Sequence, residues 1–432
     1  MTAPEPLPAR AFNPHLAAGS DRMHAVVREM IGLLENYEKF YSTRKRKRRP
    51  ADQKTFERTV EALVCDLISR ELEYPGASIH LPLSNRVLRK KSRYKGVALG
   101  KTLPDVLRSM KAEEMSMVEM TKGTKIFRVI DSELNTTFSY GKQTTLRAGE
   151  KLRNRIAWEH LSQDDIAEDP EEEVILLRDK KTRSDKPGHL LEYRDTEKTN
   201  RLRTEMQTIN RRLREAWIAC SRCNIHTNRR RLRRIFQDGD FANGGRLYGG
   251  FWQSMKGKDR LAEIALGDDS TVELDVGQAG ILALYAIAGA KPPEGDLYDL
   301  TAADIPTRCR DGIKKVMNAM VSSAKPLKRM PKGARETIPL QYTVRDIQRA
   351  IDAVHPALTH YWCSGLHSRV WRIESDALVR VLLELGDRGI TALPVHDAIL
   401  VFAEHSETAQ EVMRTVFGEA FGVTPTITET WD

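Results

Sequence analysis

The sequence predicts an α+β protein in which antiparallel strands carry two aspartates. Residues 390–402 are apolar on both sides of Asp397, which is the pattern of two strands joined by a tight turn. Residues 272–275 alternate in polarity and end at Asp275, and residues 278–285 continue as an apolar, helix-like run. We therefore expect each carboxylate to be delivered by the end of a strand.

The first 150 residues are expected to precede the site as two regions. Residues 1–50 contain the basic run Arg44–Arg49 and are predicted to be a flexible segment. Residues 51–150 are predicted to bind nucleic acid, and their first element is a helix over 53–75, where apolar side chains recur every four residues.

A helix followed by a hairpin is predicted next. Thr102 is a helix cap, and residues 116–120 and 125–130 read as strands around the turn 121–124. A helix and a hairpin with a basic tip are compatible with a winged helix.

Residues 151–235 are predicted to be a thumb-like helical connector. One apolar stripe marks a long helix, formed by Leu202, Met206, Ile209, Leu213 and Trp217. An ordinary core helix has the same pattern, so both interpretations stay open. A second basic run, Arg229–Arg234, leads into residues 236–432.

Two further motifs lie between or before the aspartates. Arg310 and Lys314 are four residues apart, so on a helix they share one face and can hold the same polyanion. Upstream stands Gly245-Arg246-Leu247. In this order the motifs resemble those of the family A polymerases, which include bacterial DNA polymerase I and the single-subunit phage-type RNA polymerases. The resemblance covers residues 236–432 and implies a right-hand polymerase with a palm, and with fingers around residues 305–370.

The resemblance implies a two-metal site. Asp275 and Asp397 would bridge two Mg²⁺ ions, with Mn²⁺ as a substitute and the backbone carbonyl of Val276 as a third ligand. Oxygen ligands suit Mg²⁺, which keeps several waters and substrate phosphates. Template-directed transfer needs such a pair of ions to activate a 3′-hydroxyl and to neutralise the leaving pyrophosphate.

The same resemblance assigns roles to basic side chains. Arg310 and Lys314 would bind the β- and γ-phosphates of a nucleoside triphosphate, and Lys314 could protonate the departing pyrophosphate. Arg246 and His396 would contact the primer and template.

Two departures from the family bear on the substrate. At Gly280, DNA polymerases of the family carry a glutamate that blocks a ribose 2′-hydroxyl, so glycine predicts that ribonucleotides enter. If they do not, Gln278 and Tyr285 are the candidates to close the pocket. The aromatic residue expected eight positions after Lys314 is Ser322. If the motif is anchored on Lys315 instead, Ser323 takes that position, and neither residue supplies a ring.

Composition agrees with a nucleic-acid enzyme. The net charge of +9 and pI near 9.2 fit a polyanionic partner. Five cysteines, with no signal peptide and no apolar run of transmembrane length, predict a cytoplasmic protein without a membrane partner.

Three functions follow as hypotheses. The first is DNA-dependent nucleotidyl transfer that accepts ribonucleotides, as in a primase or RNA polymerase of a phage or mobile element; its partners would be a DNA template, an RNA or DNA product, nucleoside triphosphates and other replication proteins. The second is a family A DNA polymerase that uses deoxynucleotides. The third is a catalytically silent, DNA-binding replication or regulatory factor on the same scaffold.

Overall fold

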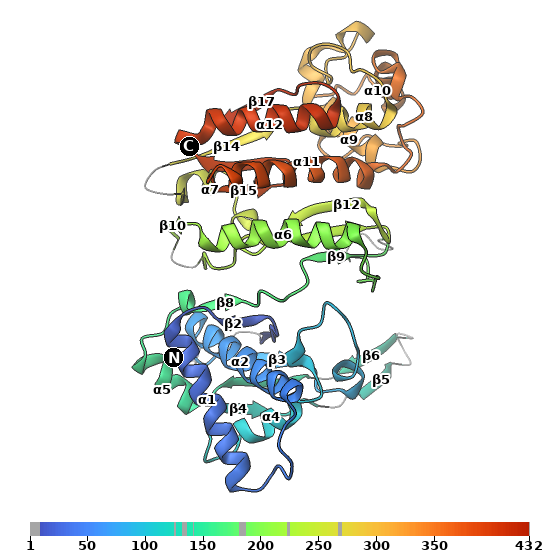
Figure 1. The fold of residues 1–432 in the computed structure, drawn as a ribbon. Helices are drawn as coiled ribbons and strands as arrows, with labels where there is room; N and C mark the ends of the chain where they lie inside the picture. The colour runs from blue at the N-terminus through green and yellow to red at the C-terminus, as the bar shows by residue number, and fades with distance from the viewer. Residues whose placement is uncertain are drawn as a thin grey trace, which may run out of the picture. The chain divides into compact units, whose positions relative to one another are not determined.

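The computed structural model describes residues 9–124, 127–131, 136–140, 142–180, 187–222, 225–266 and 270–431. They form an α+β structure, as predicted (Figure 1). The chain divides into two units, Met1–Glu173 and Val174–Asp432, and each has its own hydrophobic core. The division lies inside the segment 151–235 that the sequence analysis treated as one connector.

The N-terminal unit combines three small sheets with helices. Its largest sheet has the order β1-β3-β7-β4, formed by β1 (Arg10–Ala11), β3 (Ile79–Leu81), β7 (Thr144–Ala148) and β4 (Val118–Thr121). The other two sheets are strand pairs, β2 (Leu16–Ala18) with β8 (Ile166–Glu168) and β5 (Phe127–Asp131) with β6 (Thr136–Tyr140). The helices are α1 (Asp21–Phe40), α2 (Pro50–Glu73), α3 (Asn85–Leu88), α4 (Leu103–Met110) and α5 (Glu150–Trp158).

Helix α2 confirms the helix predicted over residues 53–75. Pro50 occupies its first turn, where the missing N–H costs nothing. The apolar side chains that recur every four residues are buried, among them Phe56, Val60 and Val64. The burial of this face against α1 and the sheets explains why the helix forms where its spacing predicts it.

Two expectations for this unit are wrong. Residues 21–40, placed in a flexible segment, form α1, because Ser20 caps the helix and one face of it is buried. The predicted hairpin across residues 121–124 does not form either. Strand β4 pairs with β7, and β5 pairs with β6, so the winged-helix prediction fails. Residues 125–126 of that prediction lie outside the described residues.

The C-terminal unit is built on a four-stranded antiparallel sheet. Its order is β15-β16-β14-β17, formed by β15 (Ala392–Val395), β16 (Ala398–Phe402), β14 (Thr271–Val276) and β17 (Ile427–Thr430). A second sheet has the order β12-β11-β9, formed by β12 (Asp240–Tyr248), β11 (Arg233–Gln237) and β9 (Ile175–Leu177), and β10 (Ile218–Cys220) pairs with β13 (Ile264–Leu266). The helices are α6 (Glu197–Glu215), α7 (Gly257–Glu263), α8 (Ala279–Ala288), α9 (Arg310–Ser322), α10 (Val344–Val354), α11 (His367–Asp387) and α12 (Ser406–Phe421).

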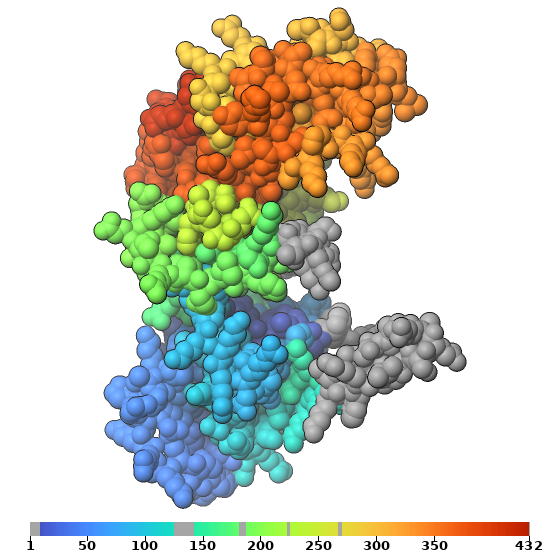
Figure 2. All heavy atoms as spheres, turned by 90° about the vertical axis from the view of Figure 1, so that its right-hand side faces the viewer, coloured from blue at the N-terminus to red at the C-terminus, as the bar shows by residue number. Residues whose placement is uncertain are grey.

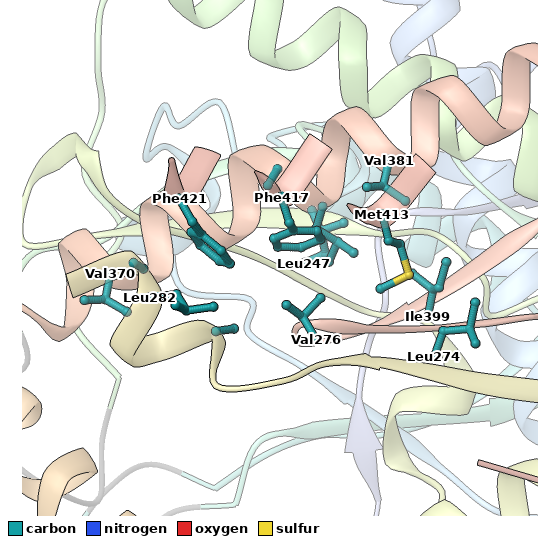
Figure 3. Packing of buried hydrophobic residues seen from close by; sticks show 14 of the residues in the cluster. Leu247, Leu274, Val276, Leu282, Val370, Val381, Ile399, Met413, Phe417 and Phe421 are labelled. Atoms are coloured by element: carbon teal, nitrogen blue, oxygen red, sulfur yellow. The ribbon is translucent and has the colours of Figure 1, made fainter. Parts of the chain in front are cut away.

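The core of this unit supports the strands that carry the aspartates. In Figure 3, Met413 of α12 points toward Leu274 of β14 and Ile399 of β16, and Phe417 lies one turn further along α12. All four side chains are buried. The packing is extensive enough to hold β14 and β16 in a fixed position beneath the residues at their ends.

Helix α6 packs its predicted stripe into the core of the C-terminal unit, with Leu202, Met206, Ile209 and Leu213 buried. Trp217 does not join them, since the helix ends at Glu215 and the indole is 60% exposed. No helix in the part of the chain that the structure describes is both long and apolar enough to cross a lipid bilayer.

Candidate active site

Two aspartates lie at the same end of two neighbouring strands. Strands β14 and β16 are antiparallel, and Asp275 pairs with Ala398. Because Asp397 directly precedes Ala398, both aspartates are at this end of the sheet. Burial, and after it the negative charge of Asp397, raises the pKa of Asp275 to about 6. The structure thus brings together the two residues for which the sequence analysis predicted metal binding.

A tight turn positions Asp397. Val395 pairs with Ala398, so His396 and Asp397 form a two-residue hairpin loop. His396 has a φ of 60°, a region that residues other than glycine rarely occupy. Hairpin strands on both sides hold this strained residue in place, and the turn therefore presents Asp397 in one orientation.

The strand before the turn is anchored by two side chains. Trp252 Nε1 and Gln253 Nε2 donate hydrogen bonds to the carbonyl oxygen of Pro394, over 2.9 and 3.1 Å. The Trp252 ring is fully buried. The segment after the Gly-Arg motif is therefore part of the support of the hairpin.

His396 faces the Gly-Arg motif. Its ring centroid is 6.3 Å from that of Tyr248, with the rings edge to face. Partial desolvation and the positive charge of Arg246 lower the pKa of His396. The imidazole is therefore neutral at neutral pH and can accept or donate one hydrogen bond.

Arg310 and Lys314 of α9 both lie near one buried aromatic ring, that of Tyr298. The Arg310 Cζ atom lies 5.3 Å and the Lys314 Nζ atom 5.8 Å from the centroid of the Tyr298 ring. Burial and Asp397 raise the pKa of Asp275, whereas the charge of Lys314 lowers it, which places the ammonium group on the side of the carboxylates. Lys314 therefore belongs to the electrostatic cluster of the two carboxylates, and Arg310 is linked to Lys314 through the Tyr298 ring.

The Arg310 guanidinium already has a partner. Its Nε and Nη2 atoms donate to the two carboxylate oxygens of Asp296, the second over 3.2 Å. The hydrogen bonds to Asp296 raise the pKa of Arg310. Asp296 was not predicted, because no sequence pattern links a loop aspartate to a helix that begins 14 residues later.

Lys315 points elsewhere. Its Nζ atom donates to the Gly333 carbonyl over 2.9 Å and to Glu336 Oε2 over 2.8 Å. The two serines of the alternative registers bond locally, Ser322 Oγ to the Asn318 carbonyl over 2.9 Å and Ser323 Oγ to the Lys325 carbonyl. Of the two lysines, Lys314 is therefore the one whose charge lowers the pKa of Asp275.

Arg246 reaches a buried carboxylate that the sequence analysis missed. Its Nη2 atom donates to Glu374 Oε2 over 2.6 Å, and its Cζ atom lies 4.6 Å from the centroid of the Trp371 ring. The Glu374 side chain is only 4% exposed. The pKa of Glu374 is raised to about 7, mainly by burial and also by the charges of Asp397 and Asp275, although Arg246 lowers it.

A glycine makes that contact possible. Gly245 has a φ of +85°, and a Cβ atom there would lie 2.8 Å from Ser375 Oγ of α11. Strand β12 can therefore approach α11 closely enough for Arg246 to meet Glu374. The spacing of α11 could have revealed this glutamate, since it occupies the apolar stripe between Val370 and Leu378.

Gly280 lies in the first turn of α8, near the same carboxylate. A Cβ atom at this position would be 3.6 Å from Glu374 Oε1. The space that a glycine leaves at residue 280 is thus bounded by a carboxylate from another helix. This neighbour was not predicted.

Gln278 is engaged with the backbone. Its Oε1 atom accepts a hydrogen bond from the Leu297 N–H over 2.6 Å. Gln278 and Arg310 line a cavity of about 630 Å³, together with Asp296 and Thr426. The contact predicted between Gln278 and a nucleotide stays a prediction.

The donor atoms fit a hard divalent cation. In the described ranges no group of three His, Cys, Asp or Glu side chains lies close enough to hold a metal ion. Two carboxylates are nevertheless the small, all-oxygen set from which Mg²⁺ is usually held, because it retains water and substrate phosphate ligands. Asp275, Asp397 and the Val276 carbonyl are the candidates.

Comparison with known proteins gives matches among solved structures. No protein family matches the sequence, and no curated protein is similar to it. Among solved structures, the chain is similar to the POL domain of Pol1 from M. smegmatis in complex with DNA primer-template and dNTP, with a TM-score of 0.33 and 13% identity. The similarity covers 53% of this chain and 51% of that chain, so it spans about half the length of either. A TM-score this low assigns neither a fold nor an activity.

Proposed function

We propose that the C-terminal unit catalyses template-directed nucleotidyl transfer by a two-metal mechanism, with a nucleoside triphosphate and a DNA template as substrates. The observation that carries the proposal is the placement of Asp275 and Asp397 at one end of adjacent strands, with Lys314 on the same side. Two carboxylates that share a site repel each other, and bound cations remove this cost.

In the proposed site, separate residues would hold the metal ions and bind the triphosphate. When bound, two Mg²⁺ ions would activate the 3′-hydroxyl and neutralise charge on the pyrophosphate. Asp275, Asp397 and the Val276 carbonyl would hold them. Lys314 would bind the triphosphate and give a proton to the pyrophosphate as it leaves the α-phosphate.

Arg310 is proposed to bind the same triphosphate. Asp296 accepts from its Nε and Nη2 atoms. An arginine has five N–H donors, and those of Nη1, which lies 3.8 Å from Asp311 Oδ1 without a hydrogen bond to it, would be available for phosphate oxygens. Asp296 then orients the guanidinium in a fixed geometry and need not be displaced.

Arg246 and His396 are proposed to contact the primer-template. Both lie beside the aspartate hairpin, and the neutral imidazole of His396 suits a hydrogen bond to a sugar or base. The buried Glu374 keeps Arg246 extended along Trp371. A strand held there would end close to Asp397.

Sugar preference separates two candidate activities. Gly280 favours an enzyme that accepts ribonucleotides, as in a primase or RNA polymerase. Glu374, whose Oε1 atom bounds the space at Gly280, favours the second candidate, a DNA polymerase that uses deoxynucleotides. A silent DNA-binding factor remains the third hypothesis, supported by the serines at positions 322 and 323 where a ring is expected.

Primer extension tests the proposal. The full chain is incubated with a labelled primer-template, either ribo- or deoxynucleoside triphosphates, and Mg²⁺ or Mn²⁺. Extension by the wild-type protein and none by Asp397→Asn supports nucleotidyl transfer. No extension with any nucleotide and metal, by a protein that binds the primer-template, would instead identify a silent factor.

A further inference from the structure

The end of α1 exposes aromatic rings. Phe40, its last residue, is 81% exposed, and Tyr41 after it is 45% exposed. The two ring centroids are 5.0 Å apart, and that of Tyr37 is 4.6 Å from Tyr41. Tyr41 also donates a hydrogen bond from its hydroxyl to Glu114 Oε1 over 2.9 Å. Tyr41 is therefore fixed, and Phe40 projects beside it as a ring without a cover.

Shortly after these rings in the sequence lie four basic side chains without an ion-pair partner in the described part of the chain. Arg44, Lys45, Arg46 and Lys47 are exposed, and none has a carboxylate within ion-pair distance among the residues that the structure describes. The next two arginines differ, since Arg48 pairs with Glu38 over 2.6 Å and Arg49 pairs with Asp52 over 2.9 Å. The basic run thus divides into Arg48, which fixes the loop to α1, Arg49, which forms an exposed pair at the start of α2, and four residues without an ion-pair partner among those described, of which Arg44 lies near enough to Asp52 for its charge to lower the pKa of that carboxyl.

The anchoring of the loop is strong enough to define a surface. The Arg48 Cζ atom lies 3.6 Å from the centroid of the buried Phe56 ring of α2, in addition to its contact with Glu38. The guanidinium is therefore stacked and ion-paired at the same time. The end of α1 and the start of α2 lie at the surface of the N-terminal unit (Figure 2).

We propose that this surface binds single-stranded nucleic acid, with a base stacked on Phe40 and phosphates on Arg44, Lys45, Arg46 and Lys47. Sequence-independent binding of single strands combines those two elements, a cationic track for the backbone and an aromatic platform for the bases. In a duplex the bases are already stacked on each other, so an exposed ring would gain nothing there. A membrane surface is disfavoured, because insertion needs a wide apolar face and only Phe40 is largely exposed here.

The inference goes beyond the proposed nucleotidyl transfer and does not rest on it. Strand binding at the end of α1 requires neither a divalent cation nor a nucleotide. It can be measured in EDTA, where the aspartate site is inactive, so the two proposals fail separately.

Fluorescence anisotropy of the full chain with a labelled oligothymidylate of about 12 nucleotides provides the test. Phe40→Ala should weaken binding about tenfold, the usual loss for one stacked base. Simultaneous replacement of Arg44, Lys45, Arg46 and Lys47 by alanine should lower the slope of log affinity against log salt by about 2.8, since each phosphate contact on a single strand contributes about 0.7.

Matched variants in the same unit serve as controls. Trp158→Ala removes a ring that is 76% exposed elsewhere, and alanine replacement of Arg86, Arg89, Lys90 and Lys91 removes the same number of exposed charges. Both should leave affinity and salt slope unchanged. The proposal is overturned if the two quadruple variants behave alike, if Phe40→Ala has no effect, or if phosphatidylserine vesicles bind more tightly than the oligonucleotide and lose that binding in Phe40→Ala.

Discussion

Arg246 donates a hydrogen bond of 2.6 Å from Nη2 to Oε2 of the buried Glu374. The carboxyl group has few other sources of stabilisation, since its side chain is 4% exposed and it lies near the negative charges of Asp397 and Asp275. Arg246 is therefore the residue that allows a charge at this position. The same arginine is proposed to contact the primer-template, so stability and binding depend on one guanidinium.

Arg246→Ala should destabilise the protein in a pH-dependent way. Burial raises the pKa of Glu374 to about 7, and loss of the arginine raises it further. The folded state then favours the protonated carboxyl, so stability falls as pH rises through that pKa. We expect a loss of about 3 kcal/mol at pH 8, the lower end for a broken buried pair, and a smaller loss at pH 6. Urea unfolding at both pH values measures it.

The double variant Arg246→Ala/Glu374→Gln is the control for that loss. It removes the buried charge along with its partner, so most of the stability should return and the pH dependence should disappear. An equal loss in the single and double variants would mean that Arg246 acts through its packing on Trp371 and not through Glu374.

Asp275→Asn and Asp397→Asn should each abolish nucleotide incorporation, by at least about a thousandfold, because an amide is a poor ligand for Mg²⁺ and lacks the charge. Binding of a primer-template should change little, since phosphate contacts dominate it. Glu407→Gln, which neutralises an exposed carboxylate of α12 in the same unit, is the control. Substantial activity in either aspartate variant would remove that residue from the site.

Arg310→Ala and Lys314→Ala should raise the apparent KM for nucleotide and also lower kcat. The charge on the leaving pyrophosphate grows in the transition state. Loss of either cation should therefore weaken binding of the transition state more than binding of the nucleotide in the ground state. Lys315→Ala is the matched control, because its ammonium group contacts Glu336 and the Gly333 carbonyl instead. If Lys315→Ala alone shows the double effect, the register anchored on Lys315 is correct. Steady-state kinetics on a primed template distinguishes the three variants.

Metal binding should weaken below pH 6. The pKa of Asp275 is raised to about 6 by burial and by Asp397, so the carboxylate is present above this pH and is lost as pH falls through it. One proton then competes with the cation, and the apparent dissociation constant for Mn²⁺ should rise about tenfold per pH unit below 6 and be flat above 7. Calorimetric titration with Mn²⁺ measures it. A constant affinity from pH 5 to pH 8 would show that Asp275 is not a ligand.

The aspartate pair was predictable because its geometry is local. A two-residue loop fixes Asp397 between β15 and β16, and alternating polarity ends β14 at Asp275. The pairing of β14 with β16 joins residues more than a hundred positions apart, and only the resemblance to a known family suggested it. The antiparallel pairing of these strands agrees with that expectation, whereas their register was not predicted.

The predictions that were wrong or incomplete share one cause, which is that the contacts involved join residues far apart in the sequence. Strand β4 pairs with β7 and not with the segment that follows it in the sequence, so the predicted hairpin does not form. Asp296 and Glu374 reach the site from a loop and from α11, and sequence spacing alone does not specify such contacts. Glu374 left a weak signal as a charge within an apolar stripe, which in general marks a buried ion pair or a functional group.

The sugar prediction now involves two positions. A Cβ atom at Gly280 would lie 3.6 Å from Glu374 Oε1, an ordinary contact, so Gly280→Ala should fold normally. If the sugar of the nucleotide occupies this space, Glu374→Ala enlarges it and should increase the preference for ribonucleotides about tenfold. Glu374→Gln keeps the volume and is the control, with little change expected.

The converse change should close the pocket. Gly280→Glu in a Glu374→Gln background adds one carboxylate without placing two side by side, and it should penalise ribonucleotides on the order of a hundredfold relative to deoxynucleotides. Single-nucleotide incorporation with both sugars measures the ratio of kcat/KM for each variant. An unchanged ratio in this double variant and in Glu374→Ala would place the sugar away from α8, and the choice between an RNA and a DNA polymerase would then depend on other side chains.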